Sequence, residues 1–198
     1  MQLIEVDYDP LPTVTNIETA LDAATPLIHP SLGSNLCVER VIDNGKVDEI
    51  FAAADHVVEA VFTTGRHSPV TLEPRTILAD YNAADAQLTV WHSTQVPYMM
   101  QWIFAHHFGL PENNVRVVAP DVGGAFGMKT PTYPEYPALL VAAKVTGRPV
   151  VWQSTRSEAF MTDTPGRDAW TDTELALDEK GKFLALRMRH ITGQGAYI

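Results

Sequence analysis

The sequence predicts an α+β fold in which mixed sheets pack against helices. Several stretches rich in β-branched and aromatic residues are separated by polar turns, which is typical of antiparallel strands. Two further stretches begin next to a proline and are followed at once by a glycine, an arrangement that helices favour. The chain has no internal repeat and no low-complexity tract, so a repeat architecture is not expected.

The N-terminal part predicts little regular structure. Residues 3–8 alternate like a strand that ends before two prolines, and Asn16 is placed to cap a short helix through Leu21. Residues 29–46 contain prolines, glycines and asparagines and are expected to form an extended linker. A short helix is predicted over 47–54.

The central part predicts denser structure. The polar residues 82–85 lie between two strand-like segments and predict an antiparallel hairpin. Gly109 is placed to end the helix that follows this hairpin. The predicted elements are strands over 57–64, 76–81 and 87–92 and a helix over 97–108.

The C-terminal part alternates between strands and helices. Two pairs of residues have capping-box spacing, in which a threonine precedes a glutamate by three positions. The predicted elements are strands over 115–119 and 148–153, a helix opened by Thr132 and Glu135 and ended by Gly147, a short helix opened by Thr155 and Glu158, and a hairpin of 171–177 with 183–192.

Composition excludes several classes of protein. With 198 residues, of which 45% are hydrophobic, the chain is long enough to bury a core and is not a disordered segment. No apolar run reaches the ~18 residues of a membrane span, and the N-terminus lacks the pattern of a secretory signal. The single cysteine, Cys37, forms no internal disulfide, which fits a reducing compartment, so we expect a cytoplasmic protein.

Charge argues against nucleic acid as a partner. The chain carries 14 Lys and Arg against 24 Asp and Glu, a formal net charge of −10. A surface this acidic repels a phosphate backbone, and no cluster of basic residues compensates for it. A bound anion would therefore depend on local backbone donors.

The glycine-rich segment V-G-G-A-F-G-M-K at 122–129 is the strongest candidate site. A strand, a glycine-rich loop and a helix in this order can present backbone N–H groups to an anion. A tight turn between strand and helix that requires glycines only for steric reasons is the alternative. A Walker A loop is excluded because Met128 precedes the Lys-Thr pair. The spacing of the glycines also departs from the Rossmann pattern.

This segment resembles the V-G-G-G-F-G-[GMN]-K loop of the molybdenum hydroxylase large subunits, the group of xanthine dehydrogenase, aldehyde oxidase and aerobic carbon monoxide dehydrogenase. Further motifs of that family follow in the family's order along nearly the whole chain. They are L-E-P-R at 72–75, W-H-S-T-Q at 91–95, V-R-V-V-A-P-D at 115–121, R-S-E at 156–158, G-R-D at 166–168 and G-A-Y at 195–197.

The resemblance implies roles for particular residues. The glutamine of the S-T-Q motif, which is Gln95 here, is expected to bind an oxygen ligand of molybdenum. The loop is expected to lie beside the metal and its pterin, and no side chain of this chain is predicted to ligate the metal. The residues implied are Gln95 and Phe126 as catalytic residues, and Gln95, Gly124, Ala125, Phe126 and Gly127 as cofactor-binding residues. Ala125 stands where the family usually has a glycine.

The resemblance also implies cofactors, partners and a domain arrangement. We expect molybdenum-molybdopterin, in its cytosine dinucleotide form, with [2Fe-2S] and FAD carried by an iron–sulfur subunit and an FAD subunit. Residues 1–28 are expected to end the family's hammerhead domain, 29–55 to form a linker, and 56–198 to be the first part of the molybdopterin-binding domain. The family's glutamate base and substrate loop are expected in the remainder of the large subunit.

Three functions remain open at this point. The first is a part of the catalytic subunit of an oxidoreductase that hydroxylates an aldehyde, an N-heterocycle or carbon monoxide with water as the oxygen source. The second is an inactive truncated or split-gene chain that needs a partner chain, and we expect the chain to be inactive alone. The third is a stand-alone anion-binding module that uses the glycine-rich loop.

Other reactive side chains are assigned ordinary roles. His106 and His107 are adjacent on a predicted helix, which points them in different directions, so a shared metal is not expected. Cys37 has no neighbouring histidine or basic cluster that would activate a thiol. Glu73 is expected to pair with Arg75 or to cap a backbone turn rather than to act as an acid or base.

Overall fold

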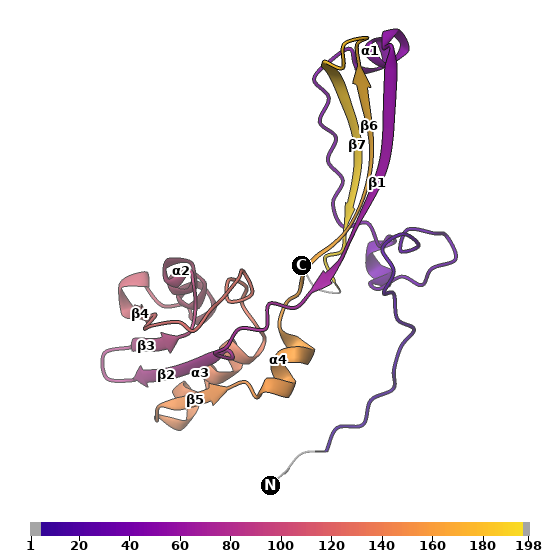
Figure 1. Cartoon of the computed structure of the whole chain (residues 1–198). Coiled ribbons are helices and arrows are strands. Elements are labelled where there is room, and N and C mark those ends of the chain that lie inside the picture. Colours follow the sequence, from indigo (N-terminus) through magenta and orange to yellow (C-terminus); the bar gives the residue numbers. More distant parts are fainter. Residues whose placement is uncertain (1–4, 196–198) are drawn as a thin grey trace. The chain divides into compact units, whose positions relative to one another are not determined.

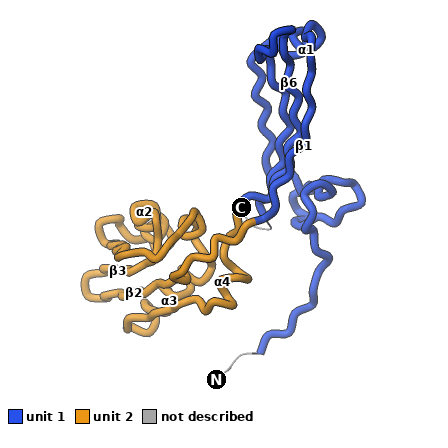
Figure 2. Tube along the Cα trace, viewed as in Figure 1, with its two compact units in different colours: residues 1–66, 167–198 blue, residues 67–166 orange. Residues whose placement is uncertain are grey.

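The computed structural model describes residues 5–195, which divide into two compact units (Figure 1 and Figure 2). Unit 1 comprises the described residues up to Arg66 together with those from Arg167 onward. Unit 2 comprises residues 67–166 and therefore contains most of the family motifs. Both units combine strands with helices, so the predicted α+β class is confirmed.

Unit 2 is built on a four-stranded sheet with the strand order β4-β3-β2-β5. The strands are β2 (Thr76–Asn82), β3 (Gln87–His92), β4 (Val115–Val118) and β5 (Val150–Gln153). β2 pairs antiparallel with both β3 and β5, which confirms the predicted hairpin. β3 pairs parallel with β4, and the crossover between them carries α2 (Pro97–Phe108) and the 3-10 turn η2 (Glu112–Asn114).

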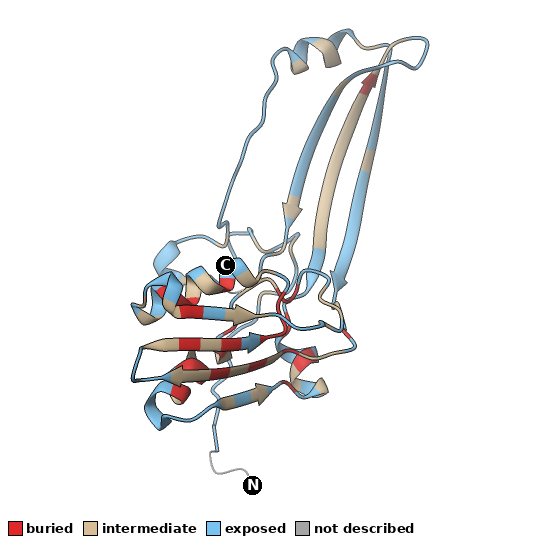
Figure 3. Cartoon of the chain, turned by 90° about the vertical axis from the view of Figure 1, so that its left-hand side faces the viewer, coloured by how far each residue is buried: buried red, intermediate tan, exposed pale blue. Residues whose placement is uncertain are grey.

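The core of unit 2 is formed by residues of the sheet together with residues of helices α2 and α3 (Glu135–Thr146). Side chains alternate along a strand, so every second residue of β2 and its partner on β3 point to the same face of the sheet. That face carries the fully buried Ile77, Ala79, Leu88 and Val90, which pack with Met100 and Phe104 of α2 and with Tyr136 and Leu140 of α3 (Figure 3).

Both long helices of unit 2 end at a glycine in the left-handed conformation. Gly109 has φ +61° after α2 and Gly147 has φ +60° after α3, as the sequence predicts. The short helix α4 (Arg156–Thr162) opens with the predicted capping box, in which Thr155 and Glu158 bond each other's backbone N–H. The capping box predicted at Thr132 is wrong, because α3 begins at Glu135 and the Glu135 carboxylate bonds Arg75 instead.

Unit 1 contains a three-stranded sheet with the order β1-β6-β7. Its elements are η1 (Pro30–Leu32), α1 (Val47–Ala53), β1 (His56–His67), β6 (Gly166–Leu177) and β7 (Phe183–Thr192). β6 and β7 form the predicted antiparallel hairpin, with an irregularity in register between Ala176 and Leu177. Arg187 of β7 pairs with Asp48 of α1 and with Glu174 of β6, and its guanidinium lies 4.4 Å from the centroid of the Phe51 ring of α1.

Two predictions for the N-terminal part are wrong. Residues 5–8 form no strand, and the rest of that predicted strand lies outside the described residues. The helix predicted through Leu21 is a series of turns, in which the Asn16 side chain accepts a hydrogen bond from the Glu18 N–H at 2.8 Å. Asparagine stabilises such a turn as readily as a helix start, so this local signal does not distinguish the two.

His92 occupies an unusual place at the end of β3. Its side chain is 1% exposed, it lies edge-on to the Tyr136 ring with 4.5 Å between ring centroids, and neither ring nitrogen has a hydrogen-bond partner within residues 5–195. Burial lowers the pKa of His92 to about 4, and the positive charges of Lys129 and Arg75 act in the same direction. The imidazole is therefore neutral at physiological pH.

We predict that unit 2 loses stability as the pH falls from about 6.5 to about 4. In that range the unfolded histidine binds a proton and folded His92 does not, so protons favour the unfolded state by as much as about 3 kcal/mol at the acid end. Urea unfolding at pH 7 and pH 4.5 measures the effect. His92→Leu should flatten this part of the pH dependence, and an unchanged slope in that variant would contradict the prediction.

Candidate cofactor-binding site

The glycine loop, residues 122–129, follows β4 but does not run directly into a helix. α3 begins only at Glu135, after a further irregular segment. The predicted order of strand, glycine-rich loop and helix is observed, but this segment separates the loop from the helix N-terminus. Any donors at this site are the loop's own N–H groups and the side chains that contact them.

The backbone of the loop requires unusual conformations. Gly124 and Gly127 have φ values of +94° and +93°, which favour glycine strongly. Phe126 also has a positive φ, of +51°, and its side chain is 79% exposed. Ala125 does not have a positive φ, so its methyl group is accommodated where the family usually has a glycine.

Four N–H groups of the loop have no acceptor in the part of the chain that the structure describes. The amides of Gly124 and Met128 bond carbonyls within the loop, and those of Gly123 and Gly127 bond side chains. Within residues 5–195, the N–H groups of Val122, Ala125, Phe126 and Lys129 are left without an acceptor, and those of Ala125 and Phe126 lie in the middle of the loop. Unpaired donors in a glycine-rich turn are suited to a ligand that carries oxygen or another acceptor atom.

The structure brings Gln95 to this loop. Its side-chain Oε1 accepts a hydrogen bond from the Gly127 N–H at 3.2 Å. Because an N–H can only donate, the oxygen end of the amide faces the loop and the NH2 end remains free of acceptors among the described residues. The neighbouring Thr94 hydroxyl donates to the Lys129 carbonyl at 3.0 Å and fixes the same segment against the end of the loop.

Of the two roles expected for Glu73, pairing with Arg75 is wrong because Glu73 pairs with Lys129, whereas its carboxylate does bond a backbone N–H of the glycine-rich turn. Its Oε2 lies 2.8 Å from the Lys129 Nζ and 2.7 Å from the Gly123 nitrogen. Burial alone would raise the pKa of the Glu73 carboxyl, but the hydrogen bonds from Lys129 and Gly123 outweigh it and lower the pKa. The contribution of Lys129 was not predicted, because the two residues are far apart in sequence and no local pattern links them.

Arg75 is fully buried and joins two helices of unit 2, α3 and α4. It bonds the Asp163 carboxylate at 2.7 Å, the Thr162 hydroxyl at 2.8 Å and the Glu135 carboxylate at 3.3 Å. Its guanidinium also lies 3.6 Å from the centroid of the Tyr133 ring. This network fixes the start of α3 and the end of α4 behind the β2 strand.

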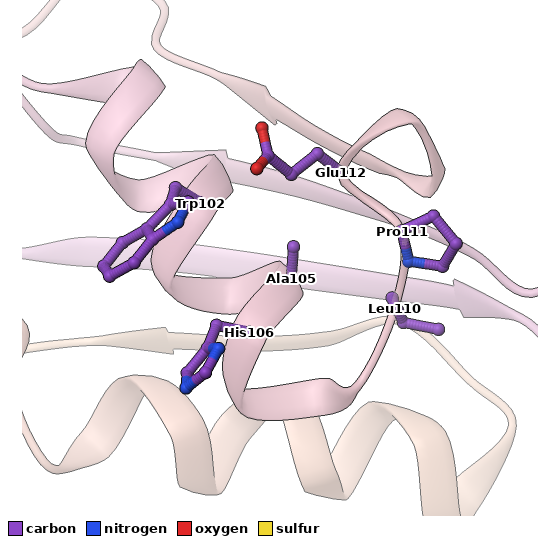
Figure 4. Close-up of a pocket in the computed structure, with 6 residues that line it drawn as sticks. All are labelled: Trp102, Ala105, His106, Leu110, Pro111 and Glu112. Carbon is purple, nitrogen blue, oxygen red and sulfur yellow. The ribbon is translucent and has the colours of Figure 1, made fainter.

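The remaining reactive side chains lie outside the loop. His106 and His107 are exposed on α2, as expected, and no group of three or more possible metal ligands occurs within residues 5–195. A shallow depression on α2 is lined by Trp102, whose ring stacks on His106, and by Glu112 (Figure 4). It contains no residue of the glycine loop, and Cys37 is exposed in unit 1.

Comparison with known proteins identifies the family to which the chain belongs. Residues 28–198, which include the loop and Gln95, match the molybdopterin cofactor-binding domain. The chain belongs to this family. Its resemblance to the molybdenum hydroxylases, inferred from the order of the motifs, is thereby confirmed.

The relatives in this family are oxidoreductases. The chain is 32% identical over its whole length to the carbon monoxide dehydrogenase large chain of Afipia carboxidovorans and covers 26% of it. It is 31% identical, again over its whole length, to the gamma subunit of the 6-hydroxypseudooxynicotine dehydrogenase complex of Paenarthrobacter nicotinovorans, of which it covers 24%. The chain thus spans about a quarter of the length of these curated relatives.

Solved structures of the family share the fold. Quinoline 2-oxidoreductase from Pseudomonas putida 86 superimposes with a TM-score of 0.89 and 36% identity, over 99% of this chain and 25% of that one. A copper- and molybdenum-containing carbon monoxide dehydrogenase superimposes with a TM-score of 0.85 and 33% identity, over 96% of this chain and 25% of that one. None of the helices within residues 5–195 is long and apolar enough to cross a membrane.

Proposed function

We propose that this chain forms part of the catalytic subunit of a molybdenum hydroxylase and that the glycine loop and Gln95 hold its cofactor. The contact between the Gly127 N–H and the Gln95 amide carries the proposal, because it joins two family motifs into one site. The donors of Ala125, Phe126 and Gln95, which have no acceptor in the described part of the chain, fit a ligand rich in acceptor atoms, as the molybdenum–pterin group is. When bound, that group supplies the redox chemistry of hydroxylation with oxygen from water.

Each residue has a distinct task in this proposal. Gln95 donates from its amide NH2 to an oxygen ligand of the metal, and since an amide does not titrate, this donor is present at any working pH. The N–H groups of Ala125 and Phe126 bind acceptor atoms of the cofactor, and Gly124 and Gly127 give the loop the conformation that exposes them. The Phe126 ring, largely exposed here, contacts the bound group or substrate.

The finer assignments rest on the same resemblance. We propose the cytosine dinucleotide form of the cofactor, [2Fe-2S] and FAD on partner subunits, and an aldehyde, an N-heterocycle or carbon monoxide as the substrate. Residues 1–28 are proposed to end the hammerhead domain and 29–55 to link it to the cofactor-binding domain at 56–198. We also propose that the family's glutamate base and substrate loop lie in the remainder of the subunit. The protein is proposed to be cytoplasmic.

The proposal is tested first by metal analysis. The protein is purified in the form that its gene encodes, with its partner subunits, from a host that makes the pterin cofactor, and molybdenum is measured per chain. We expect close to one molybdenum per chain. A folded protein without molybdenum that binds nucleotides in equilibrium dialysis would instead favour an anion-binding module.

Gln95→Ala should lower turnover by about three- to tenfold while the molybdenum content stays unchanged. The variant removes the proposed bond from the amide NH2 to the cofactor, whose net contribution is about 0.5–1.5 kcal/mol, together with the bond from the Gly127 N–H to Oε1, and it leaves the contacts of Ala125 and Phe126 in place. Steady-state turnover and metal content are measured on the same preparations. Gln153→Ala, which alters an exposed glutamine of β5, is the control and should change neither. Equal turnover in wild type and Gln95→Ala would refute the role of Gln95.

A further inference from the structure

We propose that Glu73 is a positioning residue that holds both ends of the glycine loop at a fixed separation. The inference rests on the proposed function, since it assigns to Glu73 the conformation of the loop that receives the cofactor. Glu73 belongs to the L-E-P-R motif, lies in an irregular segment ahead of β2 and is assigned no contact with the cofactor itself.

One carboxylate oxygen contacts the loop at two places. The Glu73 Oε2 accepts from the Gly123 N–H at 2.7 Å, at the start of the loop, and from the Lys129 ammonium at 2.8 Å, at its end. A third bond runs from the Glu73 N–H to the Gly123 carbonyl at 3.1 Å. The residues between Gly123 and Lys129 therefore form a loop that is closed by a single side chain.

The segment that carries Glu73 is itself anchored. The Thr71 hydroxyl donates to the Glu73 carbonyl at 2.7 Å. Arg156 of α4 donates to the carbonyls of Thr71 and Leu72 at 2.7 Å and 3.0 Å. Glu73 thus connects the loop to a helix of unit 2 rather than moving with the loop.

Close contact explains the first glycine of the motif. A Cβ atom on Gly123 would lie 2.6 Å from the Cβ of Glu73, a distance that two carbons do not tolerate. This glycine does not have a positive φ, so its requirement is the approach of Glu73 and not backbone conformation. The first glycine of the loop therefore allows the chain at residue 73 to come close enough for the Glu73 carboxylate to reach the Gly123 N–H.

The end of the loop is coupled to Gln95. The Lys129 side chain is fully buried, and Glu73 supplies the carboxylate that pairs with its ammonium. The Lys129 carbonyl accepts from Thr94, the residue immediately before Gln95. Release of Lys129 from Glu73 should therefore loosen the loop and disturb the Gln95 contact together.

The test compares Glu73→Gln and the double variant Glu73→Gln/Lys129→Met with the matched control Glu135→Gln. The double variant leaves no buried charge without a partner, so it keeps unit 2 folded even where the single variant does not. Glu135 is 30% exposed against 31% for Glu73, and it also pairs with a buried cation of the same unit. Arg75 keeps Asp163 in the control.

Two measurements are made on the protein in the form its gene encodes. Hydrogen exchange of peptides that cover 121–130 is followed in protein from a host that lacks the pterin cofactor, and molybdenum content is measured in protein from a host that makes it. We expect exchange in the loop to be about tenfold faster in both Glu73 variants and their molybdenum content to fall by more than half. Glu135→Gln should change neither quantity.

Two results would overturn the inference. One is loop exchange in the folded double variant that equals that of the wild type. The other is a loosened loop that still takes up a full complement of molybdenum. Absence of molybdenum from the folded, unmutated protein would refute the proposed function instead, and loop exchange would then decide by itself whether Glu73 orders the loop.

Discussion

Replacing Arg75 with methionine is expected to lower the free energy of unfolding of unit 2 by about 3–5 kcal/mol, the usual cost of breaking a buried ion pair from one side. Methionine roughly preserves the length and bulk of the side chain but leaves the Asp163 carboxylate, whose side chain is 3% exposed, without its cation. The hydrogen bonds from Arg75 to Thr162 and Glu135 are lost at the same time.

Urea unfolding followed by tryptophan fluorescence measures this effect. Three of the four tryptophans, Trp91, Trp102 and Trp152, lie in unit 2, so the signal reports mainly on that unit. The double variant Arg75→Met/Asp163→Asn removes both charges and should recover part of the lost stability. A single variant as stable as the wild type would show that the network contributes nothing to folding.

Gly124→Val is expected to abolish loading of the cofactor. A β-branched residue is strongly disfavoured at φ +94°, at a cost of about 1–3 kcal/mol. Its Cβ would also lie 3.2 Å from the Phe126 ring and 3.6 Å from the Cβ of Thr71. The loop must therefore change conformation, and the free N–H groups of Ala125 and Phe126 change direction with it.

Molybdenum content per chain measures the effect, and Gly147→Val is the matched control. Gly147 has φ +60° at the end of α3 and no atom within 4 Å of an added Cβ, so valine there is strained but contacts nothing. The control should lose stability and keep its molybdenum. Full molybdenum occupancy in Gly124→Val would show that the glycine loop is only a turn.

Local signals in the sequence predicted much of the secondary structure. The glycines after α2 and α3, the capping box of α4 and the polar turn between β2 and β3 all act within a few residues, and the structure confirms each of them. Local signals failed where the same residue can stabilise either of two different structures. Asn16 stabilises a turn instead of a helix, and the Glu135 carboxylate bonds Arg75 instead of closing a capping box.

The site was predicted by its motifs but not by its contacts. The order of the motifs indicated the family and named Gln95 and the glycine loop, and these are in contact in the structure. Lys129 received no role and Arg75 was assigned to the wrong partner, Glu73, because an ion pair between distant residues has no periodicity or spacing. Backbone donors were predicted for the loop, but which of its N–H groups stay unpaired within residues 5–195 was not, since that depends on the bonds that neighbouring amides make.

The sequence by itself determined the α+β class, the family and the residues of the candidate site, because these depend on composition, local chain geometry and the order of short motifs. Only the tertiary structure decided that Glu73 joins the two ends of the loop, that Arg75 connects α3 to α4, and that His92 is buried with no hydrogen-bond partner among residues 5–195. The physical reason is that ion pairs and desolvation depend on distances between residues far apart in the chain, which are set only when the whole unit has packed.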